Sequence, residues 1–448
     1  MTTKSTGPTE RKVPSGRISR LAQFGGLASA VAGNIIKGTT KQILSGQRPS
    51  LNQSLLDTDN AVSITKRLAH MRGAAMKLGQ LLSMDAGELL PAEWEPILSR
   101  LRQQADSMPK SQLLKTLEAS WSKDWHVQFS YFSFEPIAAA SIGQVHRATL
   151  KDGRQLAIKV QYPGVRESID SDIDNVASLV KLSGALPKNI DLTSILAEAK
   201  SQLKNEANYI KEADFLKAYR ANLADDPRFI VPYVVDELTD QNVLAMEYID
   251  GSPITDISEM GSATINLVCT GLMQLTYEEL FTHKLMQSDP NFANYLYQRD
   301  TQKIVLLDFG ACRKITAHTS THFLAMANAM QKQDTDAMTE ALLALGLVDN
   351  NMSDMAINTV LKACYTASEC LQSDVGYNLK QAQLIKRIQE ISMPLVSDKT
   401  AVTSPDFDVA LVNRKITGMI LLANKLGATV DFKGVLAPYL TTEKVKSL

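Results

Sequence analysis

The segment from Gln287 to Gly310 constrains the fold more than any other part of the chain. It reads QSDPNFANYLYQRDTQKIVLLDFG, with Asp289 and Asn294 in a polar loop and Asp308 at the end of an apolar run. Asp, Pro and Asn are also common in exposed turns, so the loop taken alone has a simple structural explanation. The order and spacing of the three side chains decide how the segment is interpreted.

A carboxylate, a carboxamide five residues later and a second carboxylate after an apolar strand have the order of a protein-kinase catalytic loop and metal-binding strand. Phosphoryl transfer needs Mg²⁺ held against the phosphates and a group that orients the acceptor. We therefore predict Asn294 and Asp308 as metal ligands and Asp289 as the catalytic residue that faces the acceptor. Asp-Phe-Gly alone is a weak signal, so the rest of the chain must supply the other parts.

The run from Glu135 to Val165 predicts three short strands, because its hydrophobic pattern changes and Lys151–Gly153 has the sequence of a hairpin turn. Kinases carry a strand that ends in Val-Ala-Ile-Lys, and here Leu-Ala-Ile-Lys ends at Lys159. We predict Lys159 as a catalytic and cofactor-binding residue that contacts the α and β phosphates of ATP. A lysine that protects a sheet edge is the alternative.

The loop before this strand reads AAASIGQV where a kinase carries a glycine-rich sequence. Ala138 and Ala140 occupy the first two glycine positions, Gly143 keeps the third, and Val145 keeps the valine. Alanine restricts φ and adds a methyl group that limits how closely backbone approaches a phosphate. We therefore expect this loop to hold ATP differently from an ordinary kinase loop.

A helical pattern from Leu192 to Leu223 offers two glutamates, and a kinase needs one to pair with the strand lysine. Glu206 and Glu212 are six residues apart, about 240° around one helix, so only one of them can be the direct partner. Strands are expected at 229–237 and 242–251, around a turn near Asp240, with Glu247 at the hinge that meets adenine.

The composition excludes several other classes of protein. The net charge of −1 and the absence of interleaved aromatic and basic residues argue against nucleic-acid binding. Four cysteines without CxxC spacing indicate a reducing compartment, and we predict a cytoplasmic protein. The uncharged stretch from Leu21 to Ile36 is short for a bilayer span, which leaves helix packing or shallow membrane contact.

The region from Ser54 to Ser120 is predicted to be helical, and Lys77 and Gln80 share one face of it with Gly73 and Met84. That face is either a solvated edge or a polar surface directed into a cleft. The residues alone favour the solvated edge.

These pieces occur in kinase order, and with MKLGQ upstream the chain resembles the AarF/UbiB family of atypical kinase-like proteins, which is linked to ubiquinone biosynthesis. The resemblance covers roughly residues 55 to 435. It implies an α+β, protein-kinase-like bilobal fold with an N-terminal helical extension and a mostly helical C-lobe. We expect four parts: a tail with a short apolar segment (1–50), the helical extension (51–125), the N-lobe (126–250), and the C-lobe with the catalytic loop (251–448).

The resemblance also implies functions for residues that the pattern alone leaves undecided. The family's KxGQ motif matches Lys77, Gly79 and Gln80, so the extension should fold over the nucleotide cleft and limit access of protein substrates. The implied cofactor-binding set is Lys77, Gln80, Ala138, Ala139, Ala140, Ser141, Gly143, Val145, Lys159 and Glu247.

Two departures from the family pattern bear on the site. The family has Glu-x-Asp on the long helix, whereas Glu206 is followed by Asn208. If Glu206 belongs to that motif it faces the extension, and Glu212 becomes the preferred partner of Lys159. The family's Gln-Thr-Asp reads Gln287-Ser288-Asp289, which keeps the hydroxyl group.

The resemblance implies ATP and Mg²⁺ as cofactors and an ATPase or a small-molecule or lipid kinase that supports ubiquinone biosynthesis. The implied partners are quinone precursors, other lipids and quinone-biosynthesis enzymes, with peripheral contact on the inner face of a membrane. One alternative is a nucleotide-gated lipid-binding or chaperone-like pseudokinase without phosphotransfer. A kinase of the aminoglycoside or choline type is a weaker alternative, because MKLGQ and AAAS argue against it.

Overall fold

The fold was analysed in a computed structural model whose described residues are 108–140, 142–182, 192–398, 400, 401, 403 and 405–440. The predictions for Lys77, Gln80, Ser141 and the apolar segment from Leu21 to Ile36 lie outside these residues. The chain divides into two units, Met1–Lys217 with Tyr233–Tyr248, and Ala218–Pro232 with Ile249–Leu448. Each unit is described by itself, and the four-part division expected from the sequence stays a prediction.

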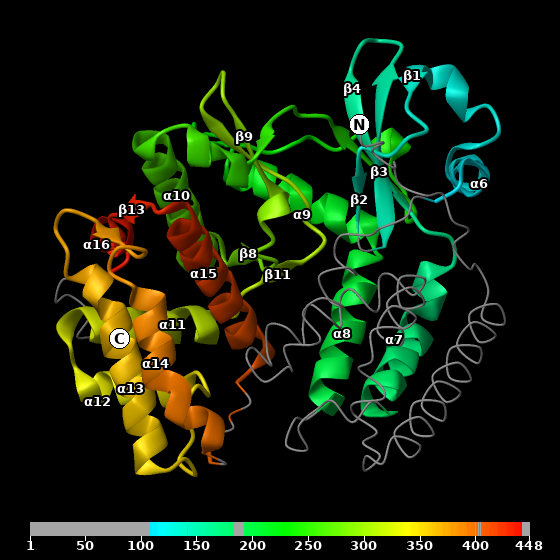
Figure 1. Cartoon of the computed structure of the whole chain (residues 1–448). Helices are drawn as coiled ribbons and strands as arrows, with labels where there is room; N and C mark the ends of the chain where they lie inside the picture. The colour runs from blue at the N-terminus through cyan, green and yellow to red at the C-terminus, as the bar shows by residue number, and fades with distance from the viewer. Residues whose placement is uncertain are drawn as a thin grey trace, which may run out of the picture. The chain divides into compact units, whose positions relative to one another are not determined.

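An antiparallel sheet forms the centre of the first unit (Figure 1). Its strand order is β1-β3-β4-β6, and β2 pairs with β3; the strands are β1 (Phe129–Phe132), β2 (Ala138–Ala139), β3 (Gly143–Leu150), β4 (Gln155–Gln161) and β6 (Val243–Glu247). Gly153 turns the chain between β3 and β4 with a φ of 92°, which glycine adopts without steric cost. The predicted hairpin is confirmed, but β4 continues two residues beyond Lys159.

The helices of the first unit correct one prediction. The structure has α6 (Lys110–Trp121), α7 (Val165–Leu182), α8 (Leu192–Glu206) and α9 (Tyr209–Asn222), whose last five residues belong to the second unit, so the single helix expected from Leu192 to Leu223 is wrong. The chain breaks at Ala207 and Asn208, where the Asn208 side chain accepts a hydrogen bond from the Lys211 N–H at 3.1 Å. A side-chain oxygen in this position starts a new helix.

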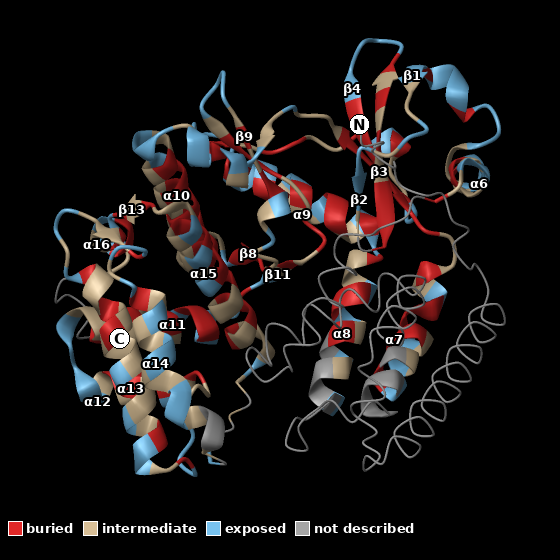
Figure 2. Ribbon diagram, in the orientation of Figure 1, coloured by how far each residue is buried: buried red, intermediate tan, exposed pale blue. Residues whose placement is uncertain are grey.

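The core of the first unit packs against the face of the sheet that carries Leu156, Ile158 and Val160, and it also includes Leu244 on the other face. Leu156, Ile158 and Val160 of β4 are fully buried, and the rings of Trp121, Trp125, Phe129 and Phe132 pack on one another beside β1. Figure 2 shows the buried residues along β3 and β4. Because Leu156, Ile158 and Val160 occupy one face of β4, the Lys159 side chain lies on the other face.

The second unit is mostly helical, as predicted. Its helices are α10 (Ser262–Tyr277), α11 (Ala317–Lys332), α12 (Thr335–Ala344), α13 (Asp354–Ser368), α14 (Leu384–Ser397), α15 (Phe407–Leu426) and α16 (Phe432–Leu436). Side-chain caps define the starts of four of them: Thr316, Asp334, Ser353 and Asp431 each accept a hydrogen bond from a backbone N–H of the first turn. α10 and α15 lie side by side (Figure 1).

Short strands in the second unit position the predicted catalytic segment. One sheet has the order β5-β10-β9-β7, and two further pairs are β8 with β11 and β12 with β13. The bounds are β5 (Phe229–Ile230), β7 (Ser252–Pro253), β8 (Leu285–Gln287), β9 (Tyr295–Gln298), β10 (Lys303–Leu306), β11 (Cys312–Lys314), β12 (Tyr377–Asn378) and β13 (Thr429–Val430). Of the strand expected at 229–237, only Phe229–Ile230 forms a strand, which pairs with β10, and Val234 makes an isolated antiparallel bridge to Met246 of β6.

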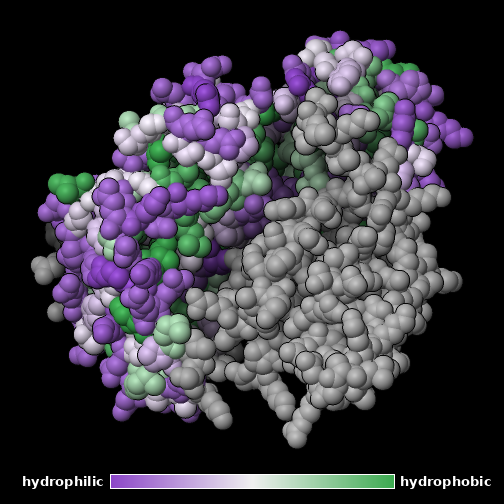
Figure 3. Space-filling model, in the orientation of Figure 1, coloured by the Kyte–Doolittle hydropathy of each residue, from purple (hydrophilic) through white to green (hydrophobic). Residues whose placement is uncertain are grey.

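The visible surface of the second unit is mainly hydrophilic, with scattered hydrophobic side chains (Figure 3). Leu267 of α10 and Leu421 of α15 are among the exposed large hydrophobic residues. No helix in the described part of the chain is both long and apolar enough to cross a membrane.

Candidate nucleotide site

A buried ion pair in the first unit joins β4 to α9. The Nζ atom of Lys159 lies 2.8 Å from Oε1 and 3.0 Å from Oε2 of Glu212. The side chains are 8% and 1% exposed, respectively. Hydrogen bonds between charged groups in a buried setting hold both partners in one geometry. Glu212 is therefore the residue that fixes the position of the Lys159 ammonium.

The break between α8 and α9 explains why Glu212 is the partner. The Asn208 cap places Glu212 in the first turn of α9, where the partial positive charge of a helix N-terminus favours a carboxylate. Glu206 ends α8 and is only half-buried. The pairing preferred on the family resemblance is thus the one that the structure contains, although the two glutamates do not lie on one helix.

Ala157, which sequence reasoning missed, shares the sheet face of Lys159 with the predicted residue Val145. Side chains alternate between the two faces of a strand, and opposite residues share a face. Val145 of β3 lies opposite Lys159, whereas Ala157, two residues earlier on β4, lies opposite Met246 of β6. Period-two spacing from Lys159 was the signal that could have identified Ala157.

The alanine-rich loop is a tight hairpin. Ala138 and Ala139 form β2 opposite Val145 and Gln144, and both alanines are exposed. The Ala140 N–H donates to the Gly143 carbonyl oxygen at 2.9 Å, which closes the turn. The alanines therefore hold regular strand geometry before the turn, and their contact with a nucleotide stays a prediction.

Gly143 has a packing function that the comparison with kinase loops did not predict. A Cβ atom at this position would lie 2.5 Å from the Val160 carbonyl oxygen and 2.7 Å from the Tyr209 hydroxyl. Its φ is not in the left-handed region, so conformational freedom is not the reason for glycine here. Only glycine lets β3 pass this close to β4 and α9.

Glu247 ends β6, and its hydrogen bonds stay within the first unit. Its N–H donates to the Tyr233 carbonyl oxygen at 2.9 Å, and its Oε2 accepts from the Tyr233 N–H at 3.4 Å. The next N–H, of Tyr248, donates to the Gln155 carbonyl oxygen at 2.9 Å. The Glu247 side chain therefore supports the strand end, and contact with adenine stays a prediction for its backbone.

In the second unit, the loop after β8 holds Asp289 and Asn294 in one turn. Asp289 is half-buried, and its Oδ1 accepts from the Asn291 N–H at 3.3 Å. Asn294 is 6% exposed, and its Nδ2 lies 3.5 Å from the Asp289 carbonyl oxygen. The turn thus fixes the carboxamide while the Asp289 carboxylate remains partly exposed.

Asp308 follows β10 in a strained conformation. Its φ of 56° lies in the left-handed region, which a residue with a Cβ adopts at some cost and which is common at functional sites. Gln287 donates from Nε2 to the carbonyl oxygens of Leu307 and Asp308, both at 2.6 Å. These two bonds hold the backbone of Asp308 in place.

The metal ligands predicted from sequence are brought together by strand pairing. Tyr295 lies opposite Leu306 in the β9–β10 pair, and the Leu307 N–H donates to the Asn294 carbonyl oxygen at 2.8 Å. The described residues contain no cluster of three His, Cys, Asp or Glu side chains that could hold a metal. One carboxylate and one carboxamide nevertheless fit Mg²⁺, which usually takes its other ligands from phosphates and water.

Residues 100–342 match the model of the ABC1 atypical kinase-like domain. The chain is 36% identical over 424 residues to the atypical kinase COQ8, mitochondrial, of Saccharomyces cerevisiae, covering 93% of this chain and 83% of the relative. It is also 36% identical to the atypical kinase COQ8B, mitochondrial, of Danio rerio, covering 94% and 68%.

Among solved structures, the chain is similar to Rv3197 of Mycobacterium tuberculosis, determined in complex with erythromycin. The TM-score is 0.59 at 26% sequence identity, and the similarity covers 86% of this chain and 96% of that one. The similarity therefore extends over both units of the chain.

Proposed function

Because the chain belongs to the family of ABC1 atypical kinase-like proteins, we propose that it binds ATP with Mg²⁺ and either hydrolyses ATP or phosphorylates a small molecule or lipid. The family and the α+β, kinase-like fold expected from the sequence are confirmed by the matched domain and relatives. The observation that carries the proposal is the buried Lys159–Glu212 pair.

In the first unit, we assign the phosphates to Lys159. The Glu212 carboxylate sets the direction of the ammonium group, which is a compact donor suited to phosphate oxygens. Val145 and Ala157 offer an apolar surface on the same sheet face, which suits the flat ring of adenine. The exposed Ala138 and Ala139 limit how closely the loop backbone approaches the phosphates.

In the second unit, we assign Mg²⁺ to Asn294 and Asp308. The metal, when bound, neutralises the charge that develops on the phosphoryl oxygens. Gln287 keeps the Asp308 backbone in place, and the Asn294 carbonyl is fixed by the Leu307 N–H. Asp289 would accept a hydrogen bond from the attacking water or acceptor hydroxyl, for which its partly exposed carboxylate is suited.

Family membership also supports a proposal for the phosphoryl acceptor, the partner proteins and the cellular location. The relatives named above are called mitochondrial atypical kinases, and the AarF/UbiB resemblance connects the family to ubiquinone biosynthesis. We propose quinone precursors or other lipids as ligands and quinone-biosynthesis enzymes as partners. A cytoplasmic location with peripheral contact on the inner face of a membrane is part of this proposal.

Steady-state turnover of Mg-ATP tests the proposal, with and without phospholipid vesicles and a phenol that mimics a quinone precursor. Asp308→Asn removes the charge of a metal ligand, so turnover should fall at least about a hundredfold. Asp300→Asn makes the same chemical change at an exposed position between β9 and β10, so its turnover should match that of the wild type. Equal turnover of Asp308→Asn and wild type would overturn the metal assignment.

A further inference from the structure

A second buried lysine lies on α15, outside every kinase motif. The Nζ atom of Lys415 donates to the Tyr295 hydroxyl at 2.8 Å and lies 3.4 Å from Oε2 of Glu279. Lys415 is 1% exposed, and Tyr295 and Glu279 are fully buried. The kinase-like chemistry proposed above gives these side chains no direct part.

Glu279 extends this network to a third element. Its Oε1 accepts a hydrogen bond from the Tyr219 hydroxyl at 3.0 Å, and the same hydroxyl lies 3.2 Å from the Leu285 carbonyl oxygen. Glu279 lies in a π-helical turn, Glu278–His283, at the end of α10. Turns of this type occur frequently at functional sites.

One end of the network is next to a predicted metal ligand in the chain, and the other end begins the strand that leads to the predicted catalytic residue Asp289. Tyr295 directly follows Asn294, and Leu285 begins β8, which leads into the Asp289 loop. The Tyr219 ring packs on the ring of Phe309 with centroids 5.1 Å apart, and Phe309 directly follows Asp308. The network therefore reaches the loop and strand that carry the proposed metal ligands.

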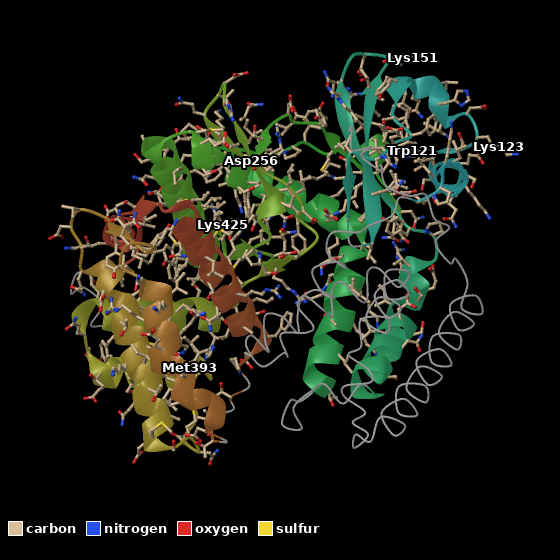
Figure 4. All side chains as sticks on the ribbon, viewed as in Figure 1. Trp121, Lys123, Lys151, Asp256, Met393 and Lys425 are labelled. Carbon is tan, nitrogen blue, oxygen red and sulfur yellow. The ribbon has the colours of Figure 1, made fainter. Side chains whose placement is uncertain are left out.

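Three further contacts bring α15 against the same loop. Arg414 donates from Nη2 to the Ser288 carbonyl oxygen at 3.3 Å, and the ammonium of Lys425, labelled in Figure 4, lies 5.8 Å from the centre of the Phe292 ring. A Cβ atom on Gly418 would lie 2.2 Å from Cβ of Pro290. Four positions of α15 thus contact four positions between Ser288 and Tyr295.

A buried ion pair is a costly way to stabilise a protein, because removing both charges from water offsets most of their attraction. Burial opposes the charge on Lys415, yet Glu279 and Tyr295 hold the pKa of that lysine above its ordinary value. Burial raises the pKa of Glu279, and the Lys415 ammonium reverses only part of this effect. The network therefore gives a fixed geometry more than it gives stability.

We propose that α15 is a positioning element for the catalytic loop, and that Lys415 is a positioning residue that acts through Tyr295 on Asn294. Lys415 holds the strand that follows Asn294, Arg414 holds the residue before Asp289, and Gly418 allows α15 to approach Pro290. This inference rests on the proposed function, because α15 would affect the reaction through the position of Asn294, which is a proposed Mg²⁺ ligand.

The first test uses Gly418→Ala, which places a methyl group against Pro290. Hydrogen exchange of residues 288–295 should become at least tenfold faster, and half-saturation by Mg²⁺ in ATP turnover should rise at least tenfold. Gly271→Ala is the matched control on α10, where an added Cβ would lie 3.4 Å from Cδ1 of Ile304. The proposal is wrong if Gly418→Ala leaves both quantities at the values of the control.

The second test separates positioning from folding. Lys415→Met combined with Glu279→Leu removes both charges, so the double variant should fold, yet its Mg²⁺ half-saturation should remain at least tenfold above that of wild type. If Lys415 had only a structural function, the double variant would both fold and show the Mg²⁺ half-saturation of the wild type. That result would contradict the proposal. If wild type itself hydrolyses no ATP, the proposed function fails, whereas hydrogen exchange of residues 288–295 still decides whether α15 holds the loop.

Discussion

Among the described residues, each unit contains a buried lysine–glutamate pair, and the two pairs differ in their hydrogen-bond partners. Lys159 contacts both carboxylate oxygens of Glu212, at 2.8 and 3.0 Å, and keeps 8% of its side chain exposed. Lys415 lies 3.4 Å from Oε2 of Glu279 and donates to the Tyr295 hydroxyl, while Oε1 of Glu279 accepts from the Tyr219 hydroxyl.

The difference indicates two uses of the same chemistry. Lys159 keeps a small exposed fraction and shares its sheet face with Val145 and Ala157, which agrees with the nucleotide contact proposed for it. Lys415 is 1% exposed and contacts Tyr295 and Glu279, so we expect it to act on the elements that it joins. We therefore expect substitutions in the Lys159–Glu212 pair to weaken mainly nucleotide binding. Substitutions in the Lys415–Glu279 pair should mainly lower the stability of the second unit and its affinity for Mg²⁺.

The largest expected effect is on the stability of the second unit. Lys415→Met leaves Glu279 buried without its cation, so the free energy of unfolding should fall by about 3–5 kcal/mol. Urea unfolding followed by circular dichroism measures this loss. The described tryptophans, Trp121 and Trp125, lie in the first unit, so fluorescence should report a first-unit transition near that of wild type. A fall in the free energy of unfolding of less than about 1 kcal/mol would contradict the interpretation that Lys415 and Glu279 form a buried ion pair.

The next effect concerns the first pair. Lys159→Met should weaken ATP binding about a hundredfold, since a charged donor to the phosphates is lost. It also leaves Glu212 unpaired, so Lys159→Met with Glu212→Leu provides the control for folding. Calorimetric titration should find that the double variant regains stability and not ATP affinity. Recovery of both would mean that Lys159 is structural.

The smallest effect is the response of the first unit to acid. Burial lowers the pKa of His146 to about 4, although its bond to the Ser133 carbonyl raises it in part. The unfolded chain, with a histidine pKa near 6.5, takes up the proton first as the pH falls, so stability is lost between pH 6.5 and pH 4. From pH 7 to pH 5 the unfolding free energy should fall by about 2 kcal/mol.

Tryptophan fluorescence in urea at the two pH values measures this loss in the first unit. His146→Gln removes the titrating group and keeps a polar side chain beside Gln144, so its loss between the same pH values should be about 2 kcal/mol smaller. An equal loss in the variant and in the wild type would show that His146 is not the group responsible.

The sequence predicted the parts of the site that short motifs specify. Lys159, Asp289, Asn294 and Asp308 each belong to a short motif that can be identified from neighbouring residues. The turn at Gly153 follows from local backbone chemistry. The break before α9 also had a local signal, because Asn208 is a good helix start, but the helical pattern on either side concealed it.

The remaining features depend on residues that are far apart in the chain. Lys415 meets Tyr295 across 120 positions, and nothing near either residue in the sequence indicates a buried partner. Gly143 is required by the hydroxyl of Tyr209 on α9, whereas the motif suggested a phosphate contact. Such requirements follow from tertiary packing, which a single sequence does not reveal.

Binding of ATP tests the central claim most directly. Calorimetric titration of ATP into wild type should give saturable binding that requires Mg²⁺ and that Asp308→Asn weakens at least about tenfold, whereas Asp300→Asn should bind as wild type does. ATP binding that is unchanged by EDTA and by Asp308→Asn would contradict the account, as would the absence of binding to the wild-type protein.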